Sequence, residues 1–150
     1  MLKEFIEINN LKARLLAVMK PVSSPLGAAS FIDVSASNIA KTVLFIDKDK
    51  CGVLCVIPAN SSINEQKIQK IVSNGLLLPA SQKQCLETTG YELEFVPPVS
   101  VYGIKVLLDE SLAEKKTIYC SAGEKQKLLV ISPHEIIEHN EDIQVVDICI

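Results

Sequence analysis

Tryptophan is absent from this sequence, and aromatic residues make up only 5% of its 150 residues. Apolar residues nevertheless account for 48% of the chain. We therefore expect a core built from Ile, Leu, Val and Ala side chains, which are aliphatic and among the residues that proteins most often bury. A chain of this length corresponds to one domain, which we place over residues 1–150.

Long apolar runs are also missing. The longest uninterrupted ones span only a few residues, whereas a membrane-spanning helix needs about 20. The N-terminal residues 1–16 are charged and amphipathic, and they lack the apolar segment of a secretory signal. These absences predict a cytoplasmic protein with no membrane partner.

The sequence has no excess of positive charge, because its formal net charge is −3 at pH 7. Non-specific binding to nucleic acids depends on Lys and Arg side chains that neutralise phosphates. Any contact with RNA would therefore have to be local, or helped by a partner.

Cysteine is present, but not in the pattern of a disulfide scaffold or a zinc site. The count of five is odd, and no two cysteines form a CxxC pair. Four of them lie in apolar, strand-like segments, where a reduced thiol behaves as a small hydrophobic group. We predict that these four are buried and reduced: Cys51, Cys55, Cys120 and Cys149.

Motifs for metal, nucleotide and triad chemistry are missing as well. His134 and His139 stand five residues apart, which on a helix turns them away from each other by roughly 140°. The sequence has no GxxxxGK(S/T) phosphate loop, no GxGxxG and no GxSxG elbow. We therefore predict no metal and no cofactor. A Ser-His-Asp triad stays open, because triads are defined by geometry, although a surface position on a first helical turn suits His134 better.

The remaining pattern is that of a single α/β domain with a mixed sheet and flanking helices. Two apolar segments on either side of the charged turn DKDKCG predict a hairpin that is buried on both faces. Three helix starts carry Ser-x-x-Glu/Gln capping boxes, at Ser62, Ser81 and Ser132. The expected strands are 11–19, 42–46, 53–57, 104–108, 117–120, 128–131 and 145–148. The expected helices are 2–8, a short one within 21–31, 63–72, 82–90 and one from residue 133.

Two features could carry function. Lys41 stands at the entry to a very apolar strand, where a lysine usually extends its charge to solvent. The segments TGYELEFVPP (89–98) and YCSAGEKQ (119–126) combine a rigid Pro-Pro turn with a small-residue loop, which lets backbone approach a ligand closely. Taken alone, the two segments are better explained as ordinary loops.

These features, in this order and spacing, resemble the YbaK/prolyl-tRNA editing-domain family. The resemblance covers most of the chain and runs through NIAKTVLFID, VLCVIPANSSIN, TGYELEFVPP, VLLDESL and IYCSAGEKQKLLVISPHEII. It implies a mixed, partly closed sheet with helices around it. It also implies an aminoacyl-tRNA deacylase, which hydrolyses the ester between a wrong amino acid and the 3′-terminal adenosine of a tRNA(Pro)-type substrate.

The resemblance also implies site residues. Lys41 matches the functionally required lysine of the family, and we expect it to act as a point charge on the terminal nucleotide. The family uses no side-chain nucleophile, so a positioned water or a substrate group would attack the ester. The partner would be aminoacyl-tRNA, with an aminoacyl-tRNA synthetase left open as a second one. The expected substrate-binding residues are Gly90, Tyr91, Glu94, Phe95, Val96, Pro97, Pro98, Ser121, Ala122 and Gly123.

One departure from the family pattern affects function. Family members commonly carry a Gly-Gly pair where this chain has Glu94 and Phe95. A glutamate facing a phosphate or ester would repel it, and a residue other than glycine is restricted in backbone angles. The alternative is therefore a non-catalytic member of the same fold that binds aminoacyl-tRNA or a protein.

Overall fold

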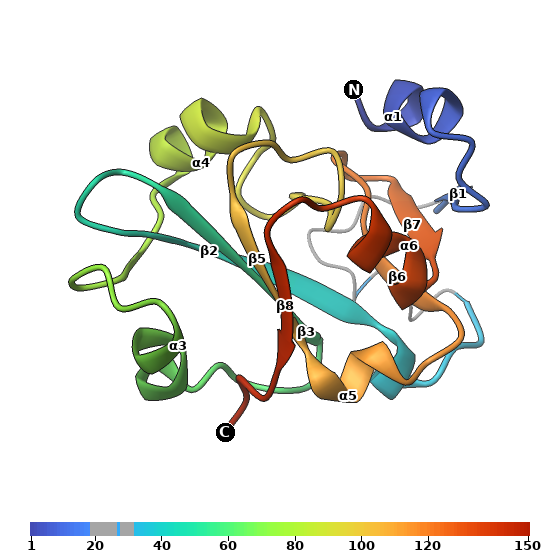
Figure 1. Cartoon of the computed structure of the whole chain (residues 1–150). Coiled ribbons are helices and arrows are strands. Elements are labelled where there is room, and N and C mark those ends of the chain that lie inside the picture. The colour runs from blue at the N-terminus through green and yellow to red at the C-terminus, as the bar shows by residue number, and fades with distance from the viewer. Residues whose placement is uncertain (19–26, 28–31) are drawn as a thin grey trace.

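Residues 1–18, 27 and 32–150, which the computed structural model describes, form two β-sheets with helices around them (Figure 1). The smaller sheet has the strand order β1-β7-β6 and the larger one β4-β2-β3-β5-β8. In chain order the strands are β1 (Arg14–Ala17), β2 (Ala40–Ile46), β3 (Gly52–Pro58), β4 (Leu78–Pro79), β5 (Lys105–Asp109), β6 (Ile118–Ser121), β7 (Lys127–Ile131) and β8 (Ile143–Val146). β2 contacts β6, and Ile39 forms a parallel bridge with Tyr119. The two sheets meet there, which confirms the predicted mixed, partly closed sheet.

Helices lie around both sheets (Figure 1). They are α1 (Leu2–Ile8), the 3-10 turn η1 (Ala36–Asn38), α3 (Glu65–Ile71), α4 (Gln82–Thr89), α5 (Glu110–Ala113) and α6 (Pro133–Glu138). In the described part of the chain, no helix is long and apolar enough to cross a membrane.

The larger sheet separates two cores. One face of β2, β3 and β5 packs with β6 and β7 of the smaller sheet, through residues such as Leu44, Val56 and Leu129. The opposite face packs against α3, where Phe45 and Ile68 belong to one buried cluster. Because side chains alternate along a strand, the two cores take alternate residues of the same strands.

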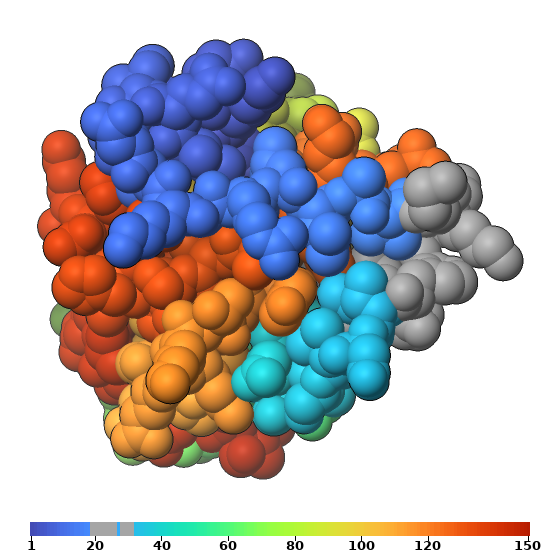
Figure 2. All heavy atoms as spheres, turned by 90° about the vertical axis from the view of Figure 1, so that its right-hand side faces the viewer, coloured from blue at the N-terminus to red at the C-terminus, as the bar shows by residue number. Residues whose placement is uncertain are grey.

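The N-terminal segment contains β1, the edge strand of the smaller sheet. Figure 2 shows it in blue, lying across the orange and red C-terminal part of the chain. β1 pairs with β7 over four residues, from Arg14↔Val130 to Ala17↔Lys127. The backbone N–H of Lys12 also donates to Glu135 Oε2 at 2.8 Å. These contacts fasten the first residues of the chain to its last quarter.

Several elements are confirmed. The first helix has the predicted bounds, and α4 begins with a complete capping box at Ser81 and ends at Gly90 in the left-handed region. β2 and β3 form the predicted hairpin, paired from Ala40↔Pro58 to Ile46↔Gly52. The predicted short helix within 21–31 lies outside the described residues except for Gly27.

Other expectations were wrong. β3 is buried along its whole length, but residues 41–43 of β2 are only half-buried, and Lys41 and Val43 among them border a groove. Helix α3 is capped by Asn64 rather than Ser62, because Ile63 pairs with Cys149 and keeps the chain extended up to that point. At Ser132 only half of the capping box forms, since the Glu135 side chain accepts from Lys12 instead.

The predicted burial of four cysteines was wrong at one of them. Cys55 and Cys120 are buried and Cys149 is half-buried, but Cys51 is exposed. Cys51 closes the hairpin turn, where its backbone N–H donates to Asp47 Oδ1 at 2.9 Å. A turn at the end of a two-stranded ribbon projects into solvent, so an apolar neighbourhood in sequence does not bury it.

Candidate functional site

Lys41 lies on β2 at the edge of an open groove between the hairpin and α3. The groove has a volume of about 660 Å³. Val43, Phe45 and Ile57 contribute apolar surface to it, and Ser62, Asn64, Glu65 and Gln66 line the α3 side. We call this cavity the Lys41 groove. Among the described residues, no partner forms a hydrogen bond or ion pair with the Lys41 side chain, so its ammonium group is available to an anionic ligand.

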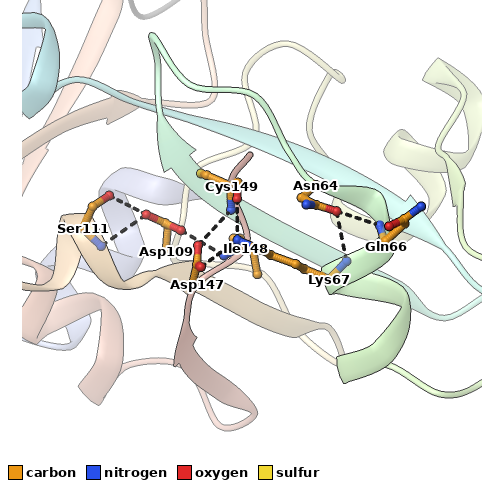
Figure 3. Close-up of polar contacts among 8 residues, drawn as sticks. All are labelled: Asn64, Gln66, Lys67, Asp109, Ser111, Asp147, Ile148 and Cys149. Carbon is orange, nitrogen blue, oxygen red and sulfur yellow. Dashed lines mark hydrogen bonds and ion pairs between the residues drawn. The ribbon is translucent and has the colours of Figure 1, made fainter.

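The far wall of the Lys41 groove is held by a network around the C-terminal segment (Figure 3). The backbone N–H of Ile148 donates to Asp109 Oδ1 at 3.0 Å. Lys67 Nζ donates to Asp147 Oδ2 at 2.7 Å and to the Cys149 carbonyl at 2.8 Å. These bonds join residues 147–149 to both β5 and α3, next to Ile150, which lines the groove.

The two predicted loop segments do come together. We call residues 90–100 and 121–123 the double loop. The Gly123 N–H donates to the Phe95 carbonyl at 2.8 Å, and Ser121 Oγ donates to the Glu94 carbonyl at 3.3 Å. The Tyr91 hydroxyl and Ser100 Oγ lie 2.9 Å apart in the interior.

Most predicted residues of the double loop are buried rather than open to a ligand. The buried ones are Tyr91, Phe95, Val96, Pro97, Pro98, Ser121 and Ala122. Gly123 is half-buried, while Gly90 and Glu94 are exposed. Gly123 needs its missing side chain, because its φ is +83° and a Cβ there would lie 2.8 Å from Tyr91 Cε1.

Lys41 and the double loop lie on opposite faces of β2. Thr42 Oγ1 donates to the Val96 carbonyl at 2.7 Å, which fixes the double loop to β2. Neighbouring side chains of a strand point to opposite faces, and Lys41 lines the groove together with Val43 and Phe45. The predicted site therefore consists of two parts: a charged groove, and a buried support behind the same strand.

The structure also shows what Glu94 and Phe95 do. The Glu94 side chain is exposed, and the Phe95 side chain is buried with 5% of its surface accessible. The carbonyl groups of both residues accept bonds from the second segment of the double loop. The N–H groups of Phe95 and Gly123 are already bonded, to Glu92 and Phe95 respectively. Neither N–H is free to stabilise an oxyanion in this arrangement.

Three of the cysteines are not activated nucleophiles. Burial raises the pKa of Cys55 to about 12 and that of Cys149 to about 11, so both thiols are protonated at neutral pH. Burial also raises the pKa of Cys120. As expected, His134 is on the surface, with 77% of its side chain accessible and Nε2 at 3.0 Å from Glu138. The described residues contain no group of three or more His, Cys, Asp or Glu side chains placed to hold a metal.

Sequence reasoning missed the α3 side of the groove. Glu65 and Gln66 line it, although the sequence suggested only that residues 62–65 form a capping box. A signal was present in Asn64, because asparagine is among the strongest N-cap residues and marks the next residue as the helix start. Nothing local indicated that this helix start would face Lys41.

Residues 20–138 match the family described as aminoacyl-tRNA editing domain. The chain is 27% identical over 122 residues to a proline–tRNA ligase of Aquifex aeolicus (strain VF5), which covers 80% of this chain and 21% of the ligase. It therefore spans about a fifth of that enzyme. It is also 28% identical over 123 residues to the uncharacterized protein YwhH of Bacillus subtilis (strain 168), over 81% of this chain and 78% of YwhH.

Two solved structures share the fold. Hypothetical protein APE2540 has a TM-score of 0.89 at 30% sequence identity, over 99% of this chain and 98% of its own. A proposed trans-editing enzyme for prolyl tRNA synthetase has a TM-score of 0.81 at 23% identity, over 98% of this chain and 91% of its own.

Proposed function

This chain belongs to the aminoacyl-tRNA editing-domain family, and on that premise we propose that it hydrolyses the ester of misacylated tRNA, acting in trans. The observation that carries the proposal is the ammonium group of Lys41, which has no partner in the described part of the chain and lies in a groove with apolar surface from Val43, Phe45 and Ile57. An uncompensated charge on a rigid strand suits a ligand that brings its own negative charge, as a tRNA terminus does.

In this proposal Lys41 binds a phosphate of the 3′-terminal nucleotide and so positions the ester in the groove. Holding the ester in one orientation lowers the barrier by removing the entropy cost of alignment. Water attacks the ester carbonyl carbon, the tetrahedral intermediate collapses, and the ribose hydroxyl leaves, which releases the free amino acid. A water nucleophile agrees with the raised pKa values of the Cys55 and Cys149 thiols.

We further propose tRNA(Pro)-type substrates, a cytoplasmic site of action, and contact with a prolyl-tRNA synthetase. Support comes from the likeness to about a fifth of a proline–tRNA ligase and to a proposed trans-editing enzyme for prolyl tRNA synthetase. The net charge of −3 agrees with a protein that binds only the end of a tRNA, or that relies on a partner for the rest.

A second candidate function is non-catalytic binding of aminoacyl-tRNA. One observation favours it: Glu94 and Phe95 replace the glycine pair, and the N–H groups of Phe95 and Gly123 are bonded within the double loop. A site without free backbone donors lacks an important means of stabilising an oxyanion. A non-catalytic binder would still need Lys41 and the same groove. The two functions differ only in whether the bound ester is hydrolysed.

A deacylation screen over misacylated tRNAs tests the proposal, with Lys41→Ala as the variant. We expect the parent to release at least one amino acid. In the variant kcat/KM should fall tenfold or more, which corresponds to about 1.4 kcal/mol of transition-state stabilisation. The control is Lys83→Ala on α4, an exposed lysine outside the groove.

Both variants should unfold within about 0.5 kcal/mol of the parent, as surface substitutions usually do. Turnover that survives Lys41→Ala would refute the site assignment. A parent that hydrolyses no substrate, but loses tRNA binding in Lys41→Ala, would identify the non-catalytic binder.

A further inference from the structure

The Lys41 groove contains a second charged side chain of opposite sign. Glu65 is the first residue of α3, is exposed, and lines the groove across from Lys41. Within the described part of the chain, neither side chain forms an ion pair with any other residue. The groove therefore presents a separated pair of charges, a cation on β2 and an anion on α3.

The end of an aminoacyl-tRNA has the matching pair of charges. Its terminal phosphodiester is negative, and the protonated α-amine beside the ester carbonyl is positive. We propose that Glu65 binds the α-ammonium group of the amino acid while Lys41 binds the phosphate, so that the groove selects esters with a free amine. This inference rests on the proposed function and adds a specificity-determining residue to it.

A smaller recess fixes the direction in which the ligand lies. It has a volume of about 200 Å³ and shares Phe45, Glu65 and Gln66 with the groove. Its remaining lining is largely apolar, from Ile68, Leu76 and Leu77. The amino acid, which carries its ammonium group and its side chain on the same carbon, therefore fits the α3 end. The charged nucleotide fits the Lys41 end.

The backbone on both sides of Glu65 is held in place. Asn64 Oδ1 accepts from the N–H groups of Gln66 and Lys67, at 3.1 and 3.2 Å (Figure 3). The Asn64 N–H donates to the Ile148 carbonyl at 2.9 Å. Glu65 thus has a fixed main chain and an unpaired side chain. A residue that recognises a ligand group needs this combination, because the rigid backbone sets the carboxylate's position.

The test measures binding of two stable analogues of the ester, so that it does not depend on turnover. Both are 3′-aminoacylamido-3′-deoxyadenosine 5′-phosphates, one with a free α-amine and one with an N-acetylated amine. We expect the parent to bind the free amine at least tenfold more tightly. Glu65→Gln should reduce that preference to about twofold, by weakening only the free-amine analogue.

The matched control is Glu110→Gln. Glu110 is also an exposed acidic residue in the first turn of a short helix, α5, but it lies outside the groove. Both substitutions remove the same favourable interaction between a carboxylate and a helix N-terminus. Only Glu65→Gln should change the preference between the two analogues.

The outcomes separate this inference from the proposed function. An amine preference that persists in Glu65→Gln, an equal loss for both analogues, or no binding of either one by the parent overturns the inference. Hydrolysis of misacylated tRNA by the parent decides the proposed function independently. Loss of the preference in Glu65→Gln supports the inference even in a parent that hydrolyses nothing.

Discussion

The double loop and the Lys41 groove lie on the two faces of one strand, and they differ in how their polar groups are used. In the double loop, most side chains are buried and several carbonyl groups are paired, as in the bonds from Thr42 to Val96 and from Gly123 to Phe95. In the groove, the Lys41 and Glu65 side chains line an open cavity and have no hydrogen-bond or ion-pair partner among the residues that the structure describes.

This difference suggests that one region stabilises the fold and that the other is available for binding. Paired and buried groups stabilise a conformation, whereas unpaired charges on a rigid frame are available to a ligand. Lys41 and the double loop, which the sequence alone grouped together, therefore have different structural roles. The double loop supports β2 from behind, and Lys41 presents its charge from the front of the same strand. Substitutions in the two regions should separate effects on stability from effects on binding.

The largest effect on stability is expected from Phe95→Ala. Phe95 is 5% accessible, and truncating a buried phenylalanine costs about 3–5 kcal/mol. Chemical denaturation measures the loss. The control is Glu94→Ala, whose side chain is exposed and which should change the unfolding free energy by less than about 0.5 kcal/mol. A loss below about 1 kcal/mol for Phe95→Ala, with a change in substrate preference, would place this ring in a ligand pocket.

An intermediate effect is expected from Gly123→Ala. The left-handed backbone costs alanine roughly 1–2 kcal/mol, and the new Cβ would also meet the Tyr91 ring at 2.8 Å. The control is Gly103→Ala, because Gly103 has a similar φ of +67° and nothing within 4 Å of a Cβ. The difference between the two unfolding free energies isolates the contact with Tyr91. Equal losses of unfolding free energy in the two variants would show that the double loop accommodates the new Cβ beside Tyr91 without loss of stability.

The smallest effect concerns the wall of the Lys41 groove and depends on pH. The hydrogen bond from Lys67 holds the pKa of Asp147 below its ordinary value of 3.8. A depressed folded-state pKa contributes stability that is present above the unfolded value and is lost as the pH falls through the folded value. We therefore expect Asp147→Asn to flatten the decline of stability below about pH 4, relative to the parent.

The control for this pH series is Glu141→Gln, an exposed carboxylate in the loop before β8. Thermal unfolding between neutral pH and pH 2 measures all three proteins. A decline of stability that is as steep in Asp147→Asn as in the parent would remove the Lys67–Asp147 pair as a support of the groove wall.

Local sequence signals were sufficient for several elements. Helix α4 follows from the Ser81 capping box and from Gly90, which ends it in the left-handed region. The hairpin of β2 and β3 follows from two apolar segments around a short charged turn. In these elements the partners are near in sequence, so the residues that decide the structure can be read together.

Where residues distant in sequence take part, reasoning from local sequence patterns gave a wrong prediction or none. Asn64 rather than Ser62 caps α3, because Ile63 is paired with Cys149. The two-residue strand β4 exists only through its pairing with β2, since Phe45 lies opposite Pro79. Neither pairing can be recognised from the residues of one segment alone.

The sequence by itself determined the family and the mixed α/β fold, and it singled out Lys41 and the two loop segments as candidates, because these follow from local patterns and their order. Only the tertiary structure decided that Lys41 and the double loop occupy opposite faces of β2, and that Glu65 lines the same groove as Lys41. The pairing register of a strand sets which face each side chain takes. The bonds of α3 and its N-cap to the C-terminal segment join residues 80 or more positions apart, as from Lys67 to Asp147 and from Asn64 to Ile148. Contacts of that range become specified only when the whole chain packs.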